Sequence, residues 1–135
     1  MDLQPHKPTV LVVEDRANIR YLIEVALAQY QIATVSVGTA EDAMAACRAR
    51  LPDLVLADLL LPGCPGDAFV RALRTLSGAE GIPVIMLSGM DGGLAASAAA
   101  GAQDFLAKPF DVYALVEMVE RHLRGGGACP RDAAE

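Results

Sequence analysis

Cysteines and basic residues are scarce in this sequence. The three cysteines, Cys47, Cys64 and Cys129, form no Cys-x-x-Cys pair, which argues against a disulfide framework and against a zinc site. The 11 basic residues are outnumbered by 17 acidic ones, and the net charge is -6. Because phosphate backbones are bound by basic stripes and none is visible, the sequence predicts no direct contact with nucleic acid.

Long apolar runs are also missing. The longest, residues 10–13 and 54–61, are far shorter than the roughly 20 residues of a membrane-spanning helix. The first residues lack the apolar stretch of a secretory signal. Together with cysteines interpreted as reduced thiols, these absences predict a cytoplasmic protein without membrane insertion. Hydrophobic residues still make up 53% of the chain, enough for the core of one ordinary domain.

Short apolar runs alternate with amphipathic helical patterns along the chain. Continuous β-branched runs are typical of strands buried on both faces of a parallel sheet. Five strand-helix repeats predict a single α/β domain, a doubly wound five-stranded parallel sheet in the order 2-1-3-4-5 with five helices. The predicted strands are 9–13, 32–36, 54–58, 83–87 and 104–107, and the helices lie at about 17–29, 40–49, around 69–76, about 93–100 and after 111. We expect a lead-in over 1–8, the domain over 9–124 and a flexible tail over 125–135.

Several local features of these elements are predicted as well. Thr39 is expected to cap the helix that follows it, because a threonine oxygen accepts from the free amides of the first turn. Residues 61–66 are rich in proline and glycine and are expected to form a turn-rich loop. The helical arginines, Arg74 among them, are interpreted as solvated side chains.

Polar residues follow the carboxyl ends of four predicted strands. They are Glu14, Asp15, Asp58, Ser88 and Lys108, and the predicted strand order brings them to one crevice. Three carboxylates in one place repel one another unless one is protonated or a hard cation binds, and oxygen ligands favour Mg²⁺. With a hydroxyl and a lysine beside them, these groups suit phosphoryl transfer to the Asp58 carboxylate.

Four segments resemble the receiver domain of bacterial two-component response regulators. They are Val-Val-Glu-Asp at 12–15, Asp-Leu-Leu-Leu-Pro-Gly at 58–63, Ser-Gly at 88–89 and Ala-Gly-Ala-Gln-Asp-Phe-Leu-Ala-Lys-Pro-Phe at 100–110. The resemblance extends over about residues 8–124. It implies a phosphoacceptor module in which Asp58 receives a phosphoryl group from a histidine kinase or a histidine phosphotransfer protein. Such a module is not an enzyme toward other substrates and catalyses only its own phosphorylation and dephosphorylation.

The resemblance also implies a metal site. Asp15, Asp58 and the carbonyl oxygen of Leu60 would hold Mg²⁺, and Glu14 would act mainly through a metal-bound water. Glu14 stands where aspartate is commoner in the family, which lengthens one acidic arm.

The remaining matches imply a switch. Ser88 would move toward the phosphoryl group, and the Phe105 ring would turn into the vacated space. Lys108 would contact the phosphoryl oxygens, and its bond to Pro109 is expected to be cis. The change would repack the face made by the fourth predicted helix (helix 4, about 93–100), the fifth predicted strand (104–107) and the fifth predicted helix (after 111). A separate downstream protein would read this face, which could also form a homodimer.

Three further departures from the family pattern affect these expectations. Phe105 lacks the hydroxyl of the frequent tyrosine. The interval from Ser88 to Lys108 is slightly short, so helix 4 is expected to be short or poorly ordered. Leu60 and Met90 are apolar at the two variable positions beside the phosphorylation site. Because neither can orient an attacking water, we predict slow self-dephosphorylation.

Two other functional classes are possible for a fold of this kind. A small phosphatase with an aspartate nucleophile could share this architecture, but it needs a second aspartate two residues after the nucleophile, where this chain has Leu60. A flavin or nucleotide binder needs a phosphate-cradling loop after the first strand, and the Glu14 and Asp15 carboxylates would repel a phosphate there.

Overall fold

The computed structural model describes residues 7–61, 64–89 and 101–125. Its main sheet contains five parallel strands in the order β2-β1-β3-β6-β7. Two further strands, β4 and β5, are two residues long and pair with each other, so the predicted order 2-1-3-4-5 is confirmed for the main sheet. The elements are β1 (Thr9–Val13), α1 (Ala17–Ala28), β2 (Ala33–Val37), α2 (Ala40–Ala49), β3 (Leu54–Asp58), β4 (Leu60–Leu61), β5 (Cys64–Pro65), α3 (Gly66–Leu73), β6 (Val84–Ser88), β7 (Asp104–Ala107) and α5 (Val112–Gly125).

The predicted elements differ from the observed ones mainly at their ends. Strand β2 begins one residue later than predicted because the Ile32 amide still donates to the Leu27 carbonyl at 3.2 Å and closes the end of α1. Gln31 has a φ of 64° there, which turns the chain out of the helix. Strand β6 extends to Ser88, which pairs with Ala107 of β7. The helix predicted at about 93–100, the fifth of the expected set, lies outside the described residues.

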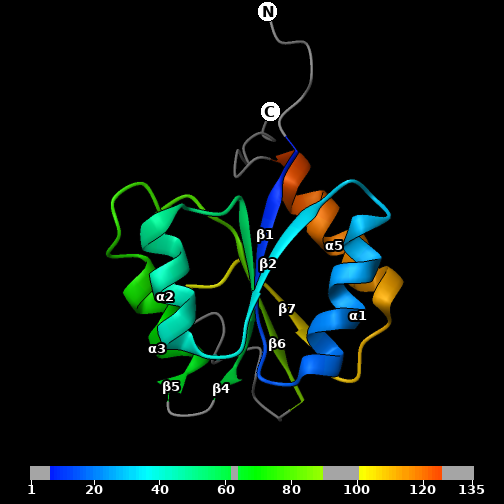
Figure 1. Cartoon of the computed structure of the whole chain (residues 1–135), viewed down its shortest axis with the longest axis horizontal. Helices are drawn as coiled ribbons and strands as arrows, with labels where there is room; N and C mark the ends of the chain where they lie inside the picture. Colours follow the sequence, from blue (N-terminus) through cyan, green and yellow to red (C-terminus); the bar gives the residue numbers. More distant parts are fainter. Residues whose placement is uncertain (1–6, 62–63, 90–100, 126–135) are drawn as a thin grey trace, which may run out of the picture.

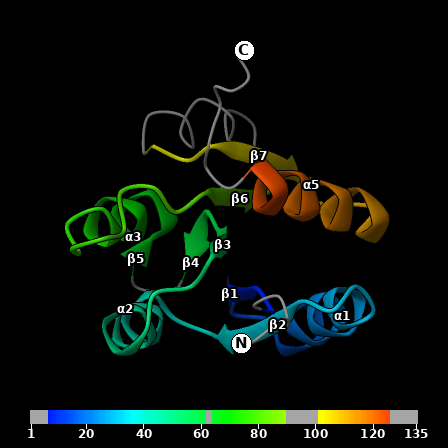
Figure 2. The same ribbon diagram turned by 90° about the horizontal axis from the view of Figure 1, so that it is seen from above.

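Each face of the sheet has its own hydrophobic core. Helices α2 and α3 cover one face and α1 and α5 the other (Figures 1 and 2). The first core contains Leu11, Val55, Phe69 and Met86, and the second contains Val12, Ile23, Leu56, Ile85 and Leu115. Adjacent residues of β1, β3 and β6 thus enter opposite cores, as the alternation of side chains along a strand requires. This burial on both faces explains why the sequence shows continuous apolar runs.

Local features of α2 and of the loop after β3 show one confirmed and one wrong expectation. The Thr39 side chain accepts from the Asp42 amide at 3.0 Å, so the predicted cap is confirmed. The turn-rich loop expected over 61–66 is wrong for the residues described there, 61 and 64–66. Leu60 and Leu61 pair antiparallel with Pro65 and Cys64, and the helix α3 already begins at Gly66. None of the helices in the described part of the chain is both long and apolar enough to cross a membrane.

Arg74 was expected to be solvated, and this expectation is wrong. Its guanidinium donates to the carbonyls of Ala79 and Ile82, both at 2.8 Å, and to the Gly101 carbonyl at 3.2 Å. It also donates to Gln103 Oε1 at 3.0 Å, and the same oxygen accepts from a β6 amide. Burial lowers the pKa of Arg74 from its ordinary value. Arg74 therefore ties the end of α3 to the turn before β6 and to the start of β7.

Candidate functional site

The predicted polar residues meet at the carboxyl ends of the central strands. Glu14 follows β1, Asp58 ends β3, Ser88 ends β6 and Lys108 follows β7. Lys108 links two of these strands directly, because its Nζ lies 2.8 Å from Glu14 Oε1 and 3.0 Å from Asp58 Oδ2. Residues that are 94 and 50 positions apart in the sequence thus form one charged cluster. The parallel order of the strands produces this arrangement, as predicted.

Glu14 is held from several sides although it is 0% exposed. Its Oε2 accepts from the Arg16 amide at 3.2 Å, and its carbonyl accepts from the Arg20 guanidinium at 2.7 Å. Its own amide donates to the Val37 carbonyl at 3.0 Å. A buried carboxylate is costly unless it is paired and hydrogen-bonded, and both oxygens of Glu14 have such a partner. The contact of Arg20 could not be predicted, because this residue has no local sequence signal that distinguishes it from a solvated helical arginine.

Lys108 is the cation of the cluster. Burial by itself lowers the pKa of its ammonium group, but hydrogen bonds and Coulomb attraction from Glu14 and Asp58 outweigh burial and raise the pKa above its ordinary value. Lys108 therefore stays protonated throughout the physiological range. One ammonium group faces the carboxylates of the crevice, and the local charge remains negative.

Three carboxylates are grouped closely enough to share a metal ion. One ligand oxygen from each of Glu14, Asp15 and Asp58 lies within 4.8 Å of the others. Asp15 is exposed, whereas Asp58 is 6% exposed. Oδ1 of Asp58 also accepts from the Leu60 amide at 3.1 Å, which fixes its carboxylate plane. An all-oxygen donor set with surplus negative charge fits a hard divalent cation such as Mg²⁺.

Ser88 and Phe105 lie on the same face of the sheet. Phe105 is paired with Met86 of β6, and Ala107 is paired with Ser88, so side chains two residues apart on each strand point the same way. Ser88 is buried, and its carbonyl accepts from the Lys108 amide at 2.8 Å. The Phe105 ring is partly buried against the core beneath α2 and α3.

Other residues singled out from the sequence have different outcomes. The peptide bond between Lys108 and Pro109 is cis, as predicted. The Leu60 side chain is 60% exposed beside Asp58 and has no polar group. Met90 lies outside the described residues. A cavity of about 760 Å³ opens over the cluster, and its walls include Asp15, Asp58 and Lys108.

Comparisons with known proteins give one consistent family. The family model of the response regulator receiver domain matches residues 10–120. The chain is 35% identical over 117 residues to the DNA-binding response regulator MtrA of Mycolicibacterium paratuberculosis, an alignment that covers 85% of this chain and 51% of MtrA. It is 35% identical over 121 residues to the phosphate regulon transcriptional regulatory protein PhoB of Pseudomonas aeruginosa, with 88% and 53% covered. The chain thus spans about half the length of these curated relatives.

Solved structures agree with the sequence relatives. A putative response regulator from Chloroflexus aurantiacus superposes with a TM-score of 0.84 at 30% identity, covering 88% of this chain and 99% of the other. The chemotaxis response regulator CheY4 of Vibrio cholerae gives 0.82 at 25% identity, covering 87% and 99%. These relatives are signalling proteins, which disfavours the phosphatase alternative. The chain belongs to the response regulator receiver domain family.

Proposed function

We propose that Asp58 accepts a phosphoryl group from a phosphohistidine of a histidine kinase or a histidine phosphotransfer protein. The observation that carries this proposal is the contact between Asp58 Oδ2 and Lys108 Nζ at 3.0 Å inside a cluster of acidic residues. A carboxylate at the end of a central strand, open to a cavity, can approach a phosphorus atom in line.

The chain's own residues have distinct tasks in this transfer. A carboxylate oxygen of Asp58 forms the new P–O bond while the P–N bond of the phosphohistidine breaks, and the imidazole leaves with the bonding pair. Lys108 exchanges its contact with Asp58 for a phosphoryl oxygen and keeps its contact with Glu14, so it reaches the transition state already oriented. The Ser88 hydroxyl donates to a second phosphoryl oxygen.

We propose Mg²⁺ as the cofactor of this step. When bound, it neutralises charge on the phosphoryl oxygens. Asp15, Asp58 and the Leu60 carbonyl would hold it. Glu14 would contribute through water, which agrees with carboxylate oxygens that are already engaged by Lys108 and by the Arg16 amide.

The proposed output is a change on the surface formed by β7 and α5. Movement of Ser88 toward the phosphoryl group would open space on the face that Phe105 shares with it, and the ring would turn into that space. A separate downstream protein, or a second copy of the chain, would read the altered surface. The expectation that the chain does not bind nucleic acid directly stays a prediction.

Phosphorylation with a small phosphodonor and Mg²⁺ tests the proposal. Intact-mass spectrometry should show one added phosphoryl group, stable in acid and labile in base, and none in Asp58→Asn. Asp53→Asn is the matched control, because Asp53 is an exposed carboxylate just before the opposite end of β3. Continuous turnover of the donor would support a phosphatase, and labelling that persists in Asp58→Asn would refute the proposed acceptor.

A further inference from the structure

Strand β2 forms one edge of the main sheet. Among the described strands it pairs with β1 alone. Its sequence, Ala-Thr-Val-Ser-Val, contains no charged residue and no proline. Natural proteins usually protect exposed edges with such residues, because an open edge pairs readily with another extended chain. This edge has neither protection.

The backbone of β2 offers hydrogen bonds to a further strand. The Ala33 amide donates to the Pro8 carbonyl at 2.9 Å, and the Val37 carbonyl accepts from Glu14 at 3.0 Å. In a parallel ladder, alternate residues direct both backbone groups to the same neighbour. Ala33, Val35 and Val37 therefore face β1, and Thr34 and Ser36 direct their N–H and C=O groups outward. An added strand would bond to these two residues.

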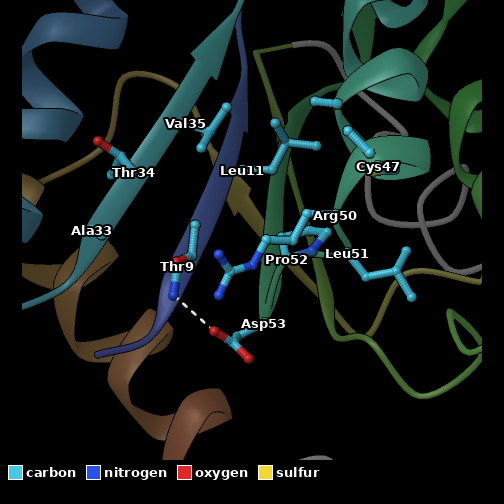
Figure 3. Close-up of a pocket in the computed structure, with 12 residues that line it drawn as sticks. Thr9, Leu11, Ala33, Thr34, Val35, Cys47, Arg50, Leu51, Pro52 and Asp53 are labelled. Carbon is cyan, nitrogen blue, oxygen red and sulfur yellow. Dashed lines mark hydrogen bonds between the residues drawn. The ribbon is translucent and has the colours of Figure 1, made fainter. Parts of the chain in front are cut away.

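An apolar cavity of about 430 Å³ lies next to this edge, on the side covered by α2. Leu11, Cys47, Leu51 and Val35 contribute to its walls (Figure 3). Val35 is 44% exposed, so the cavity is open beside the strand. Burial raises the pKa of the Cys47 thiol, which keeps it neutral and leaves it part of the apolar wall. A side chain on an added strand, opposite Val35, would point to the same face and enter this cavity.

One positive charge stands at the mouth of the cavity. The Arg50 side chain reaches from the end of α2 toward Thr9 and β2 (Figure 3). Within the described part of the chain its guanidinium makes no hydrogen bond or ion pair, whereas the neighbouring Asp53 carboxylate accepts from the Thr9 amide at 2.8 Å. Because Thr9 is paired with Ala33, Arg50 lies near the beginning of β2. It would attract an acidic group placed opposite Ala33.

We propose that β2 binds an extended peptide segment of a partner protein as a sixth strand of the sheet. The segment carries an apolar side chain for the cavity and an acidic side chain, two residues away, for Arg50. This site lies at the opposite end of the sheet from Asp58 and goes beyond the proposed phosphoacceptor function.

The test uses the full chain and an array of synthetic octapeptides. Each contains one glutamate and one leucine separated by a single residue, in either order, with serine and threonine elsewhere. We expect members that bind with a Kd of about 1 mM or lower. On binding, the amides of Thr34 and Ser36 should gain protection from hydrogen exchange, whereas the Ala33 and Val37 amides, which face β1, should change little. Alternate amides of a bound peptide point toward β2, and the others point away from it. N-methylation of the first set should abolish binding, and N-methylation of the second set should not.

Two variants examine the charge and the edge separately. Arg50→Gln should weaken the binding of the glutamate-containing peptides about tenfold. It should leave unchanged the affinity of the same peptides with glutamine in place of glutamate. Arg48→Gln is the matched control, because Arg48 is an exposed arginine of the same helix outside the cavity wall. Thr34→Pro removes an outward N–H without breaking the pairing with β1, so it should abolish binding while circular dichroism and the melting temperature show a folded protein. Val35→Lys places a charge on the same edge and serves where Thr34→Pro does not fold.

Three results would overturn the proposal. The first is an array without any binder up to 1 mM, and the second is binding that tolerates N-methylation of either set of amides. The third is that decanoate binds in an Arg50-dependent way while no peptide protects the Thr34 and Ser36 amides from hydrogen exchange. That result would assign the cavity to small apolar acids. Phosphorylation of Asp58 should be unchanged in Arg50→Gln and Thr34→Pro, so failure here would leave the proposed function intact.

Discussion

The two ends of the sheet differ in how their charged side chains are arranged. At the carboxyl ends of the strands, one oxygen from each of three carboxylates lies within 4.8 Å of the others, and Lys108 pairs with two of these groups. At the amino ends of β6 and β7, the charged side chains of Arg74 and Asp104 have neutral or opposite partners. Arg74 donates to three backbone carbonyls and to Gln103, and Asp104 lies 2.9 Å from His122 Nε2.

This difference indicates that the carboxyl end of the sheet is suited to binding and chemistry, whereas the contacts at the amino end stabilise the fold. Like charges that are held together raise the free energy of the empty site and favour the arrival of a cation. Saturated hydrogen bonds give no such driving force and instead join elements. Variants at the two ends should therefore differ in which property they change.

The largest effect is expected from Lys108→Met. It removes both ion pairs and leaves the buried Glu14 carboxylate without a cation. Breaking a fully buried pair costs about 3–5 kcal/mol, and since the Lys108 side chain is 23% exposed we expect a loss of about 2 kcal/mol. Urea unfolding measures this loss, and Mg²⁺ should recover part of it. The exposed Arg124→Met is the control, and equal losses in both variants would contradict the prediction.

Arg74→Met should lower the stability of the fold without changing the phosphorylation of Asp58. Carbonyls of Ala79, Ile82 and Gly101 lose a donor, for which we expect a loss of about 1–2 kcal/mol in the free energy of unfolding. The rate of Asp58 phosphorylation by a small phosphodonor should equal that of the parent chain. A slowed phosphorylation would show that the two ends are coupled. Arg48→Met controls for removal of an exposed arginine.

Leu60→Asn should shorten the lifetime of the acyl phosphate a few-fold, equivalent to less than about 1 kcal/mol of barrier. The exposed leucine has no group that can orient water, whereas the amide of asparagine does. Loss of the phosphoryl mass over time gives both lifetimes. A parent lifetime of seconds that Leu60→Asn leaves unchanged would contradict the predicted slow dephosphorylation.

The smallest effect concerns the pH dependence of the amino end. Burial raises the pKa of Asp104, but hydrogen bonds from His122 and the Phe105 amide, together with the charges of His122 and Arg121, outweigh it and lower the pKa. A depressed pKa contributes stability that is present above the ordinary aspartate value of about 3.9 and is lost as pH falls below it. Asp104→Asn should therefore flatten the acid limb of the stability profile and leave neutral pH almost unchanged. Denaturant midpoints between pH 7 and about 3 measure this.

Most of the fold could be predicted from the sequence because its signals are local. Continuous apolar runs identify β3 within its observed bounds, and right-handed crossovers then restrict the strand order. That order places Glu14, Asp58 and Lys108 together without any knowledge of distances. The cluster could therefore be predicted from strand ends alone.

Other contacts could not be predicted, because they depend on side chains that cross between elements. Arg20 and Arg74 have sequence surroundings like those of any helical arginine. Yet Arg20 donates to the Glu14 carbonyl, and Arg74 donates to three backbone carbonyls. Nor does the sequence tell that Glu14 is fully buried while the adjacent Asp15 is exposed. These differences arise from packing over many residues.

Strand β3 is buried at all five of its residues, and Asp58 is the last of them. The proposed acceptor is therefore anchored in a strand that contributes side chains to both cores, so a change of its backbone would disturb both. Leu60, two residues later, already faces solvent. Signal duration in this protein should thus be adjustable by exchanging surface side chains around a fixed acceptor, and a designer seeking faster or slower decay has no reason to alter the strand.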